Sequence, residues 1–180
     1  MIYMEDKFKV WTTVGSAGTL DHTDLAKVSL HQSVVQLGVE LLPPPPVAHN
    51  AATAGLFSAA VPTQQAVVRY NVTPVDGMFP SVTPAFAWAL RLRYRGRVTA
   101  RWIEVDLATG TETQLVQFDS NAFPASQSFQ VQAAFTAFRP VDFVKKAYYV
   151  EATLVAPLLI VGHPAAISIL KLSVEPPIVS

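Results

Sequence analysis

The sequence predicts an all-β fold: an antiparallel β-sandwich of about nine strands with long proline-containing loops, for which a jelly roll is one suitable arrangement. Two observations carry this prediction. Fourteen prolines and eight glycines interrupt the 180 residues at frequent intervals. Between them lie short runs rich in Val, Phe, Tyr, Trp and Thr, the residues that favour strands. Because sustained helical periodicity is scarce, we expect less than about 15% helix.

The N-terminal part is predicted to begin with a strand at residues 7–15. Residues 27–42 fit two patterns, because their apolar side chains alternate as in a strand and also recur at helical spacing. The β-branched pair Val34 and Val35 favours the strand, although the helix stays open. Prolines 43–46 predict a short, stiff polyproline segment that acts as a spacer.

The C-terminal part is predicted to carry the remaining strands, separated by proline and glycine. A turn is expected at Asp76 and Gly77 after the first of them. The expected strands are residues 66–73, 86–94, 98–107, 112–120, 128–137, 143–156 and 166–174. Residues 1–180 together suit one domain, because this is an ordinary single-domain length.

Five arginines between residues 89 and 101 define the most distinctive stretch. If Arg95, Gly96 and Arg97 form the loop of a hairpin, Tyr94 faces Val98 and the large apolar side chains all share one face. The next turn, at residues 106–112, is predicted to place Gly110 in the left-handed conformation of a bulge. Its register pairs Trp102 with Val116, Ala100 with Phe118 and Val105 with Thr113.

The opposite face of this predicted sheet is cationic at one end and aliphatic at the other. A face exposed to water should not carry several adjacent aliphatic residues, so we expect it to form an interface. Arginine suits that place, because its planar head binds carboxylates while its stem packs. The candidate interface residues are Arg91, Arg93, Arg101, Ile103, Val105 and Leu115. Binding of nucleic acid or another polyanion is not expected, since the nearby aromatic rings point inward and the net charge is zero.

The charged fraction is 14%, well below the ~25% of typical soluble domains. So few charged side chains cannot cover the surface of a small domain. Either the surface is rich in Ser, Thr, Gln and Ala, or copies of the chain cover one another, and a mixture of both with self-association is favoured. We therefore predict a non-enzymatic structural or interaction protein that self-assembles into a homo-oligomer, shell or filament, with itself as the partner.

No pattern in the sequence predicts catalysis, a cofactor or a metal. The histidines lie at no metal-ligand spacing, and the aspartates beside His22 suit turns and caps. Glu104, Asp106 and Glu112 are expected to be solvated near a turn, and Glu151 to be an ordinary strand position. No base, nucleophile and orienting group fall together, so the chain is predicted not to be an enzyme.

The cellular location is predicted only by default. Cysteine is absent, which excludes disulfides and thiolate sites. The first residues lack the apolar stretch of a secretory signal, so a cytoplasmic protein, or one assembled into a particle, is expected. No apolar run reaches the ~20 residues of a membrane-spanning helix, and no membrane insertion is expected.

A ligand-binding β-sandwich, such as a carbohydrate-binding module, is the alternative function. It requires exposed aromatic side chains. Tyr148 and Tyr149 are adjacent, so one of them points outward, and Phe135 and Phe138 lie near a loop. An all-β hydrolase, with catalytic residues far apart in the sequence, is a third hypothesis.

Overall fold

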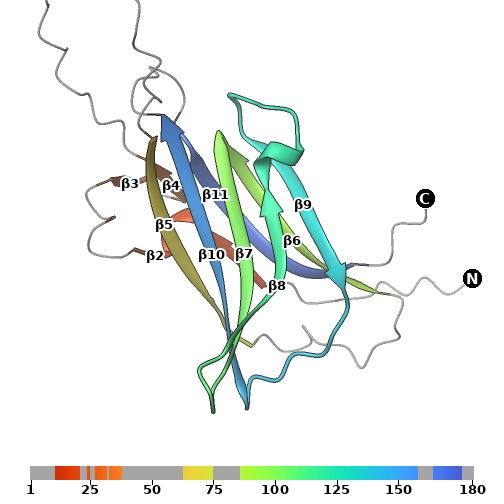
Figure 1. The fold of residues 1–180 in the computed structure, drawn as a ribbon. Helices are drawn as coiled ribbons and strands as arrows, with labels where there is room; N and C mark the ends of the chain where they lie inside the picture. The colour runs from red at the N-terminus through yellow and green to blue at the C-terminus, as the bar shows by residue number, and fades with distance from the viewer. Residues whose placement is uncertain are drawn as a thin grey trace, which may run out of the picture.

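The computed structural model describes residues 11–20, 24, 27–31, 33–37, 63–74, 86–157 and 164–175, and the structural statements below concern these residues. They form eleven β-strands and two short 3-10 helices (Figure 1). The elements are β1 (Trp11–Val14), η1 (Gly15–Ala17), β2 (Thr19–Leu20), β3 (Val28–His31), β4 (Val34–Leu37), β5 (Thr63–Val72), β6 (Ala87–Arg95), β7 (Arg97–Asp106), β8 (Glu112–Asp119), η2 (Ser120–Ala122), β9 (Gln130–Ala137), β10 (Lys146–Pro157) and β11 (Ala166–Glu175).

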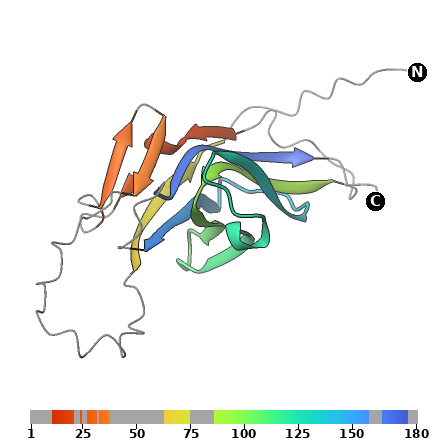
Figure 2. The same cartoon turned by 90° about the horizontal axis from the view of Figure 1, so that it is seen from above.

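The strands form two antiparallel sheets that face each other, so the predicted β-sandwich is confirmed (Figure 2). Sheet A has the order β3-β4-β11-β6-β9, with β1 also paired to β11, and sheet B has the order β2-β5-β10-β7-β8. Strands β4 to β11 alone give the orders 4-11-6-9 and 5-10-7-8. These are the two four-stranded sheets of a jelly roll.

Strands β6 and β7 do not form the hairpin that the sequence predicted. Strand β6 pairs with β9 and β11 in sheet A, whereas β7 pairs with β8 and β10 in sheet B. The chain therefore crosses between the sheets at Gly96. Alternation shows which side chains point inward, but a hairpin and a crossing between two sheets give the same alternation.

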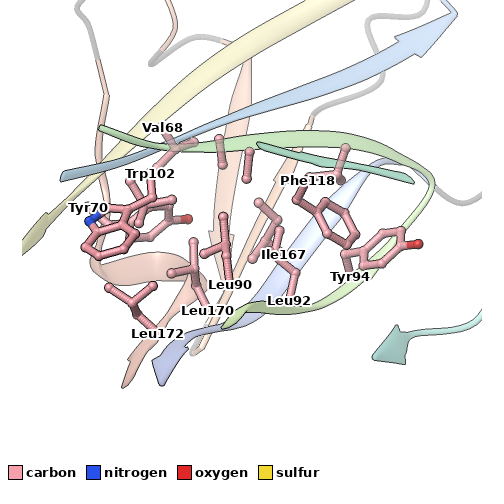
Figure 3. Packing of buried hydrophobic residues seen from close by; sticks show 14 of the residues in the cluster. Val68, Tyr70, Leu90, Leu92, Tyr94, Trp102, Phe118, Ile167, Leu170 and Leu172 are labelled. Atoms are coloured by element: carbon pink, nitrogen blue, oxygen red, sulfur yellow. The ribbon is translucent and has the colours of Figure 1, made fainter. Parts of the chain in front are cut away.

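The inward faces of the two sheets make one core (Figure 3). Trp88 of β6 meets Trp102 of β7 edge to face, with ring centroids 5.0 Å apart. Tyr94 meets Phe118 of β8 in the same manner at 5.1 Å. The side chains that the sequence placed in the core are thus buried there, opposite one another rather than side by side.

The turn between β7 and β8 forms as predicted. Gly110 has a φ of 72°, and the Asp106 carboxylate accepts hydrogen bonds from the amides of Ala108 and Thr109, both at 3.0 Å. Trp102 pairs with Val116 and Ala100 with Phe118, as predicted. A register shift between Trp102 and Ile103 then pairs Val105 with Glu112 instead of Thr113.

The ambiguous segment at residues 27–42 contains strands β3 and β4, which form a hairpin, so the strand interpretation is correct for its described residues. The first predicted strand is present as β1. Four other expectations lie outside the described residues: residues 7–10 of the first strand, prolines 43–46, the turn at Asp76 and Gly77, and the aspartate beside His22.

Two glycines with positive φ allow a matched test of the crossing between the sheets. A Cβ added at Gly96 (φ 69°) lies 2.9 Å from the Ala165 Cα, whereas one added at Gly110 (φ 72°) meets nothing within 4 Å. Gly110→Ala should therefore cost only the left-handed strain, about 1–2 kcal/mol. Gly96→Ala should destabilise the fold further, because backbone must also move. Urea unfolding of both variants measures the difference, and equal losses would contradict the close packing at Gly96.

The central tryptophan gives a second prediction. Trp102 is fully buried, and its indole Nε1 has no hydrogen-bond partner. Trp102→Ala should lower the free energy of unfolding by roughly 3–5 kcal/mol. Trp102→Phe should cost clearly less, because it keeps a ring in the core and removes a buried donor that makes no bond. Chemical denaturation distinguishes these outcomes, and equal costs would show that the ring is dispensable.

Candidate functional site

The six residues predicted to form one interface lie on two different sheets. Because β6 and β7 separate at Gly96, the two arginines of β6 are on the outer face of sheet A, and the other four residues belong to sheet B. Ile103 is only 3% exposed. The set is Arg91 and Arg93 in sheet A, and Arg101, Ile103, Val105 and Leu115 in sheet B. They do not form one continuous surface, and their role as contacts stays a prediction.

A buried carboxylate connects three strands of sheet B. Glu151 of β10 lies between Arg69 of β5 and Arg101 of β7, which flank it in the strand register. Its Oε2 accepts a hydrogen bond from Arg69 Nε at 2.9 Å, and its Oε1 is bonded by Arg101 Nη2. Glu151 is only 8% exposed, so it is not the ordinary surface position that the sequence suggested. Burial would raise its pKa, but the two arginines outweigh burial and lower the pKa.

Glu104 forms a second buried cluster, at the end of the sandwich that holds the start of β10. Its Oε1 is 2.6 Å from Lys146 Nζ, and its Oε2 is 2.7 Å from Arg139 Nη2. The Tyr148 hydroxyl donates to Oε2 at 3.1 Å. The sequence predicted a solvated Glu104 near a turn, and this prediction is wrong, because the side chain is buried. It follows Trp102 on the inward face of β7, and its partners come from residues that are distant in the sequence.

The chemistry of the Glu104 cluster is structural. Burial would raise the pKa of Glu104, but the hydrogen bonds and charges of Lys146 and Arg139 outweigh it and lower the pKa. An ionised carboxylate has no proton to donate, and a lowered pKa together with oxygens that already accept these bonds makes it a weak base. The Trp88 indole donates to the Arg139 carbonyl at 2.9 Å, so the cluster fixes the segment between β9 and β10 to the core.

A pocket of about 250 Å³ lies at the opposite end of the sandwich from the β7–β8 turn. It is formed by the β6–β7 crossing on one side and by the segment that joins β8 to β9 on the other. These two segments lie at the same end of the sandwich (Figure 1). Its described lining combines one guanidinium, two amides, two hydroxyls and one aromatic ring. The lining residues are Gly96, Arg97, Ser120, Asn121, Phe123, Ala125, Ser126 and Gln130.

Hydrogen bonds fix the polar wall of this pocket. Asp119 caps η2 by accepting the amide of Asn121 at 2.8 Å, as an N-cap carboxylate commonly does. The Ser120 hydroxyl oxygen accepts the amide of Val98 at 2.9 Å and so attaches η2 to β7. The Ser126 hydroxyl donates to the Ser128 carbonyl at 3.0 Å. The segment between β8 and β9 is therefore held in place by hydrogen bonds at several positions.

The apolar wall and the floor are fixed by the core. The Phe123 ring stacks on the ring of Phe118, with centroids 5.6 Å apart. The Gln130 amide donates to the Tyr94 hydroxyl at 2.9 Å and to the Pro124 carbonyl at 3.2 Å. Both donors of Gln130 are thus engaged, and its carbonyl oxygen remains as an acceptor.

The described arginines divide into two groups. Four form ion pairs with glutamates: Arg69, Arg91, Arg101 and Arg139. Within the described part of the chain, the other three, Arg93, Arg95 and Arg97, have no carboxylate within ion-pair distance. These three flank the β6–β7 crossing, where Arg97 also lines the pocket. Among the described residues, this end of the molecule therefore carries three guanidinium groups that no carboxylate pairs with.

The sequence did not indicate this pocket, because residues 121–127 were expected only to connect two strands. A signal was present: serine, asparagine and glutamine cluster around Phe123 and Phe129 in the eleven residues 120–130. Polar side chains interleaved with aromatic ones on a long loop are common at binding sites. The opposing wall, at Gly96 and Arg97, is distant in the sequence and depends on the crossing between the sheets.

Metal-binding clusters and membrane-spanning helices are both absent from the described ranges. Over these residues, no group of three or more His, Cys, Asp or Glu side chains is placed to hold a metal ion. The same ranges contain no helix that is long and apolar enough to cross a membrane.

No protein-family model matches the sequence, and no curated protein matches it either. Among solved structures, the fold is similar to cyclases from Fischerella sp. TAU. One, in complex with 4-(1H-indol-3-yl)butan-2-one, has 12% identity and a TM-score of 0.38, over 63% of this chain and 58% of the cyclase. A Stig cyclase complex has 11% identity and a TM-score of 0.37, over 63% and 57%. A third cyclase structure has 9% identity and a TM-score of 0.40, over 98% and 79%.

These matches contradict the prediction of a non-enzymatic, self-assembling structural protein, because the solved chains are described as cyclases and two of them bind small molecules. The low charged fraction that suggested self-assembly also fits a surface of uncharged polar side chains, such as residues 120–130. In the first two matches, the aligned part is less than two thirds of the cyclase. At this identity and TM-score, the likeness concerns the fold alone and assigns no activity to this chain.

The Glu104 cluster predicts a dependence of stability on pH. The pKa of Glu104 is lower in the folded protein than the ~4.3 of an unfolded glutamate. Its stabilisation is therefore complete above the unfolded value and is lost as pH falls through the folded value. Glu104→Gln should lower the free energy of unfolding by roughly 1–3 kcal/mol at neutral pH. The variant should also lose less of its remaining stability than the unsubstituted protein does as the pH falls into the acid range.

Glu112→Gln is the matched control, because Glu112 is exposed. Unfolding free energies measured from neutral pH to about pH 3 compare the two variants, and this window covers the range in which paired carboxylates protonate. An acid limb equally steep in Glu104→Gln and in the unsubstituted protein would show that this cluster does not govern acid stability.

Proposed function

We propose that this chain is a ligand-binding β-sandwich whose pocket, between the β6–β7 crossing and residues 120–130, takes a small, hydroxyl-rich molecule the size of one sugar residue. The observation that carries the proposal is the composition of that pocket. Arg97, Asn121 and Gln130 provide charged and amide groups around a half-buried aromatic ring, Phe123. Sites for small molecules commonly combine an apolar surface with a few fixed polar groups.

The volume and the polarity both select a small polar ligand. The pocket, of about 250 Å³, is slightly below the ~300–1,000 Å³ of sites for drug-sized ligands. A sugar ring has apolar C–H faces, which suit Phe123, and hydroxyls around its rim, which suit amides. The wall is preformed by the hydrogen bonds of Ser120 and Asn121, so little entropy is lost on ordering it.

A second hollow, of about 200 Å³, supports the proposal less well. Its described lining is Thr19, Leu20, Val67 and Arg69. Arg69 already pairs with Glu151, and no aromatic ring is among these four residues. The pocket beside η2 therefore offers more of the groups that recognise a sugar.

Removing one amide side chain from the polar wall of the pocket should weaken binding without unfolding the protein. NMR titration with glucose, galactose, mannose and N-acetylglucosamine should shift the backbone amides of the residues around Asn121. Asn121→Ala should weaken that binding about tenfold or more, because hydrogen bonds are lost. Because Asn121 is exposed, its substitution should leave the melting temperature nearly unchanged.

Asn71→Ala is the matched control, because Asn71 is an exposed asparagine on β5 and does not line the pocket. It should leave both the chemical shifts and the affinity unchanged. If no sugar in the panel shifts the residues that line the pocket, or if both variants bind equally well, the proposed function is wrong.

A further inference from the structure

Two arginines beside the pocket share one aromatic ring. The guanidinium carbons of Arg93 and Arg95 lie 4.8 Å and 5.1 Å from the centroid of the Phe129 ring. Both side chains belong to β6, two residues apart, so they project from the same face of sheet A. A cation over a ring face is held by the negative charge of that face, so Phe129 keeps the two heads together.

Hydrogen bonds fix both guanidinium groups further. Arg93 Nη1 donates to the Ser168 hydroxyl at 3.1 Å. Arg95 Nη2 donates to the Gln36 side-chain carbonyl at 2.7 Å, and Arg95 Nε donates to the Pro164 carbonyl at 3.3 Å. Each guanidinium has five N–H donors, so both retain donors for another molecule.

Arg91, the next outward-facing arginine on the same strand, differs because it forms an ion pair. Arg91 Nη2 lies 2.9 Å from both carboxylate oxygens of Glu175. No carboxylate among the described residues pairs with Arg93 or Arg95. Two like charges that are held together without a counter-ion repel each other, and an anionic group between them would remove that repulsion.

Residues that line the pocket are direct neighbours in the chain of the residues that form the arginine pair. Phe129 lies under the arginines, whereas the next residue, Gln130, lines the pocket. Likewise, Arg95 and the pocket residue Arg97 flank Gly96. Consecutive Cα atoms are about 3.8 Å apart, so a ligand with more than one sugar unit that extends past Phe129 from the pocket would reach the arginine pair.

We infer that the ligand of the pocket is one residue of an acidic polysaccharide, and that the carboxylate of an adjoining uronic acid residue binds Arg93 and Arg95. This inference rests on the proposed sugar site. Arginine suits the role because its planar fork matches the two oxygens of a carboxylate. Single-stranded nucleic acid fits less well, because the guanidinium groups cover the Phe129 ring that a base would stack on, and the net charge is zero.

Calorimetric titration with three probes tests the inference: tetragalacturonate, the neutral galactotetraose, and a short oligothymidylate. The unsubstituted protein should bind tetragalacturonate tightest, and salt should weaken that binding. The double variant Arg93→Gln with Arg95→Gln should lose about ten- to a hundredfold in affinity for tetragalacturonate. Its affinity for galactotetraose should not change. Lys171→Gln is the control for charge on the same sheet, and it should stay within about twofold.

The possible results separate the two proposals. If galactotetraose binds and tetragalacturonate binds no tighter, or if the double variant binds tetragalacturonate as tightly as the unsubstituted protein does, the inference is wrong while the proposed sugar site stands. If neither saccharide binds, the inference is wrong, and the NMR titration with the four monosaccharides decides separately whether the proposed function stands. If oligothymidylate binds as tightly as tetragalacturonate and loses as much affinity in the double variant, the arginines form a general polyanion surface, which overturns the inference.

Discussion

The contact between Trp88 and Trp102 across the sandwich is the interaction on which the rest of the structure depends. These rings come from strands that are joined only by Gly96, yet the strands lie in opposite sheets. Because both rings must leave water, β6 and β7 turn their apolar faces toward each other. That orientation fixes the outward face of each strand, and with it the position of every charged side chain that the two strands carry.

The same constraint separates charges that are close in the sequence. Arg93 and Arg95 point outward from sheet A, whereas Arg101 points outward from sheet B, where Glu151 pairs with it. Glu104 points inward at the end of its strand and pairs with Lys146. Sheet B therefore pairs its buried acids with nearby cations. In sheet A, by contrast, Arg93 and Arg95 have no carboxylate partner among the described residues, and they lie near a pocket. The binding proposals follow from this uneven distribution.

Much of the fold was predictable from the sequence, and little of the candidate site was. The core residues, the glycine turn at Gly110 and the pairing of Trp102 with Val116 follow from alternation and turn chemistry, which are local. The pocket could not be found in this way. Its two walls, at Arg97 and at Asn121, come together only because η2 attaches to β7 through Ser120, a contact between distant segments.

The sequence by itself determined that this protein is a β-sandwich and which side chains point into its core, because a strand has a period of two and its apolar face must be buried. Only the tertiary structure decided which strands became neighbours. The period is the same for a hairpin and for a crossing between sheets, so local pattern carries no information about the partner strand. For that reason Arg91, Arg93 and Arg101 were predicted to share one surface, and the fold instead placed them on two sheets.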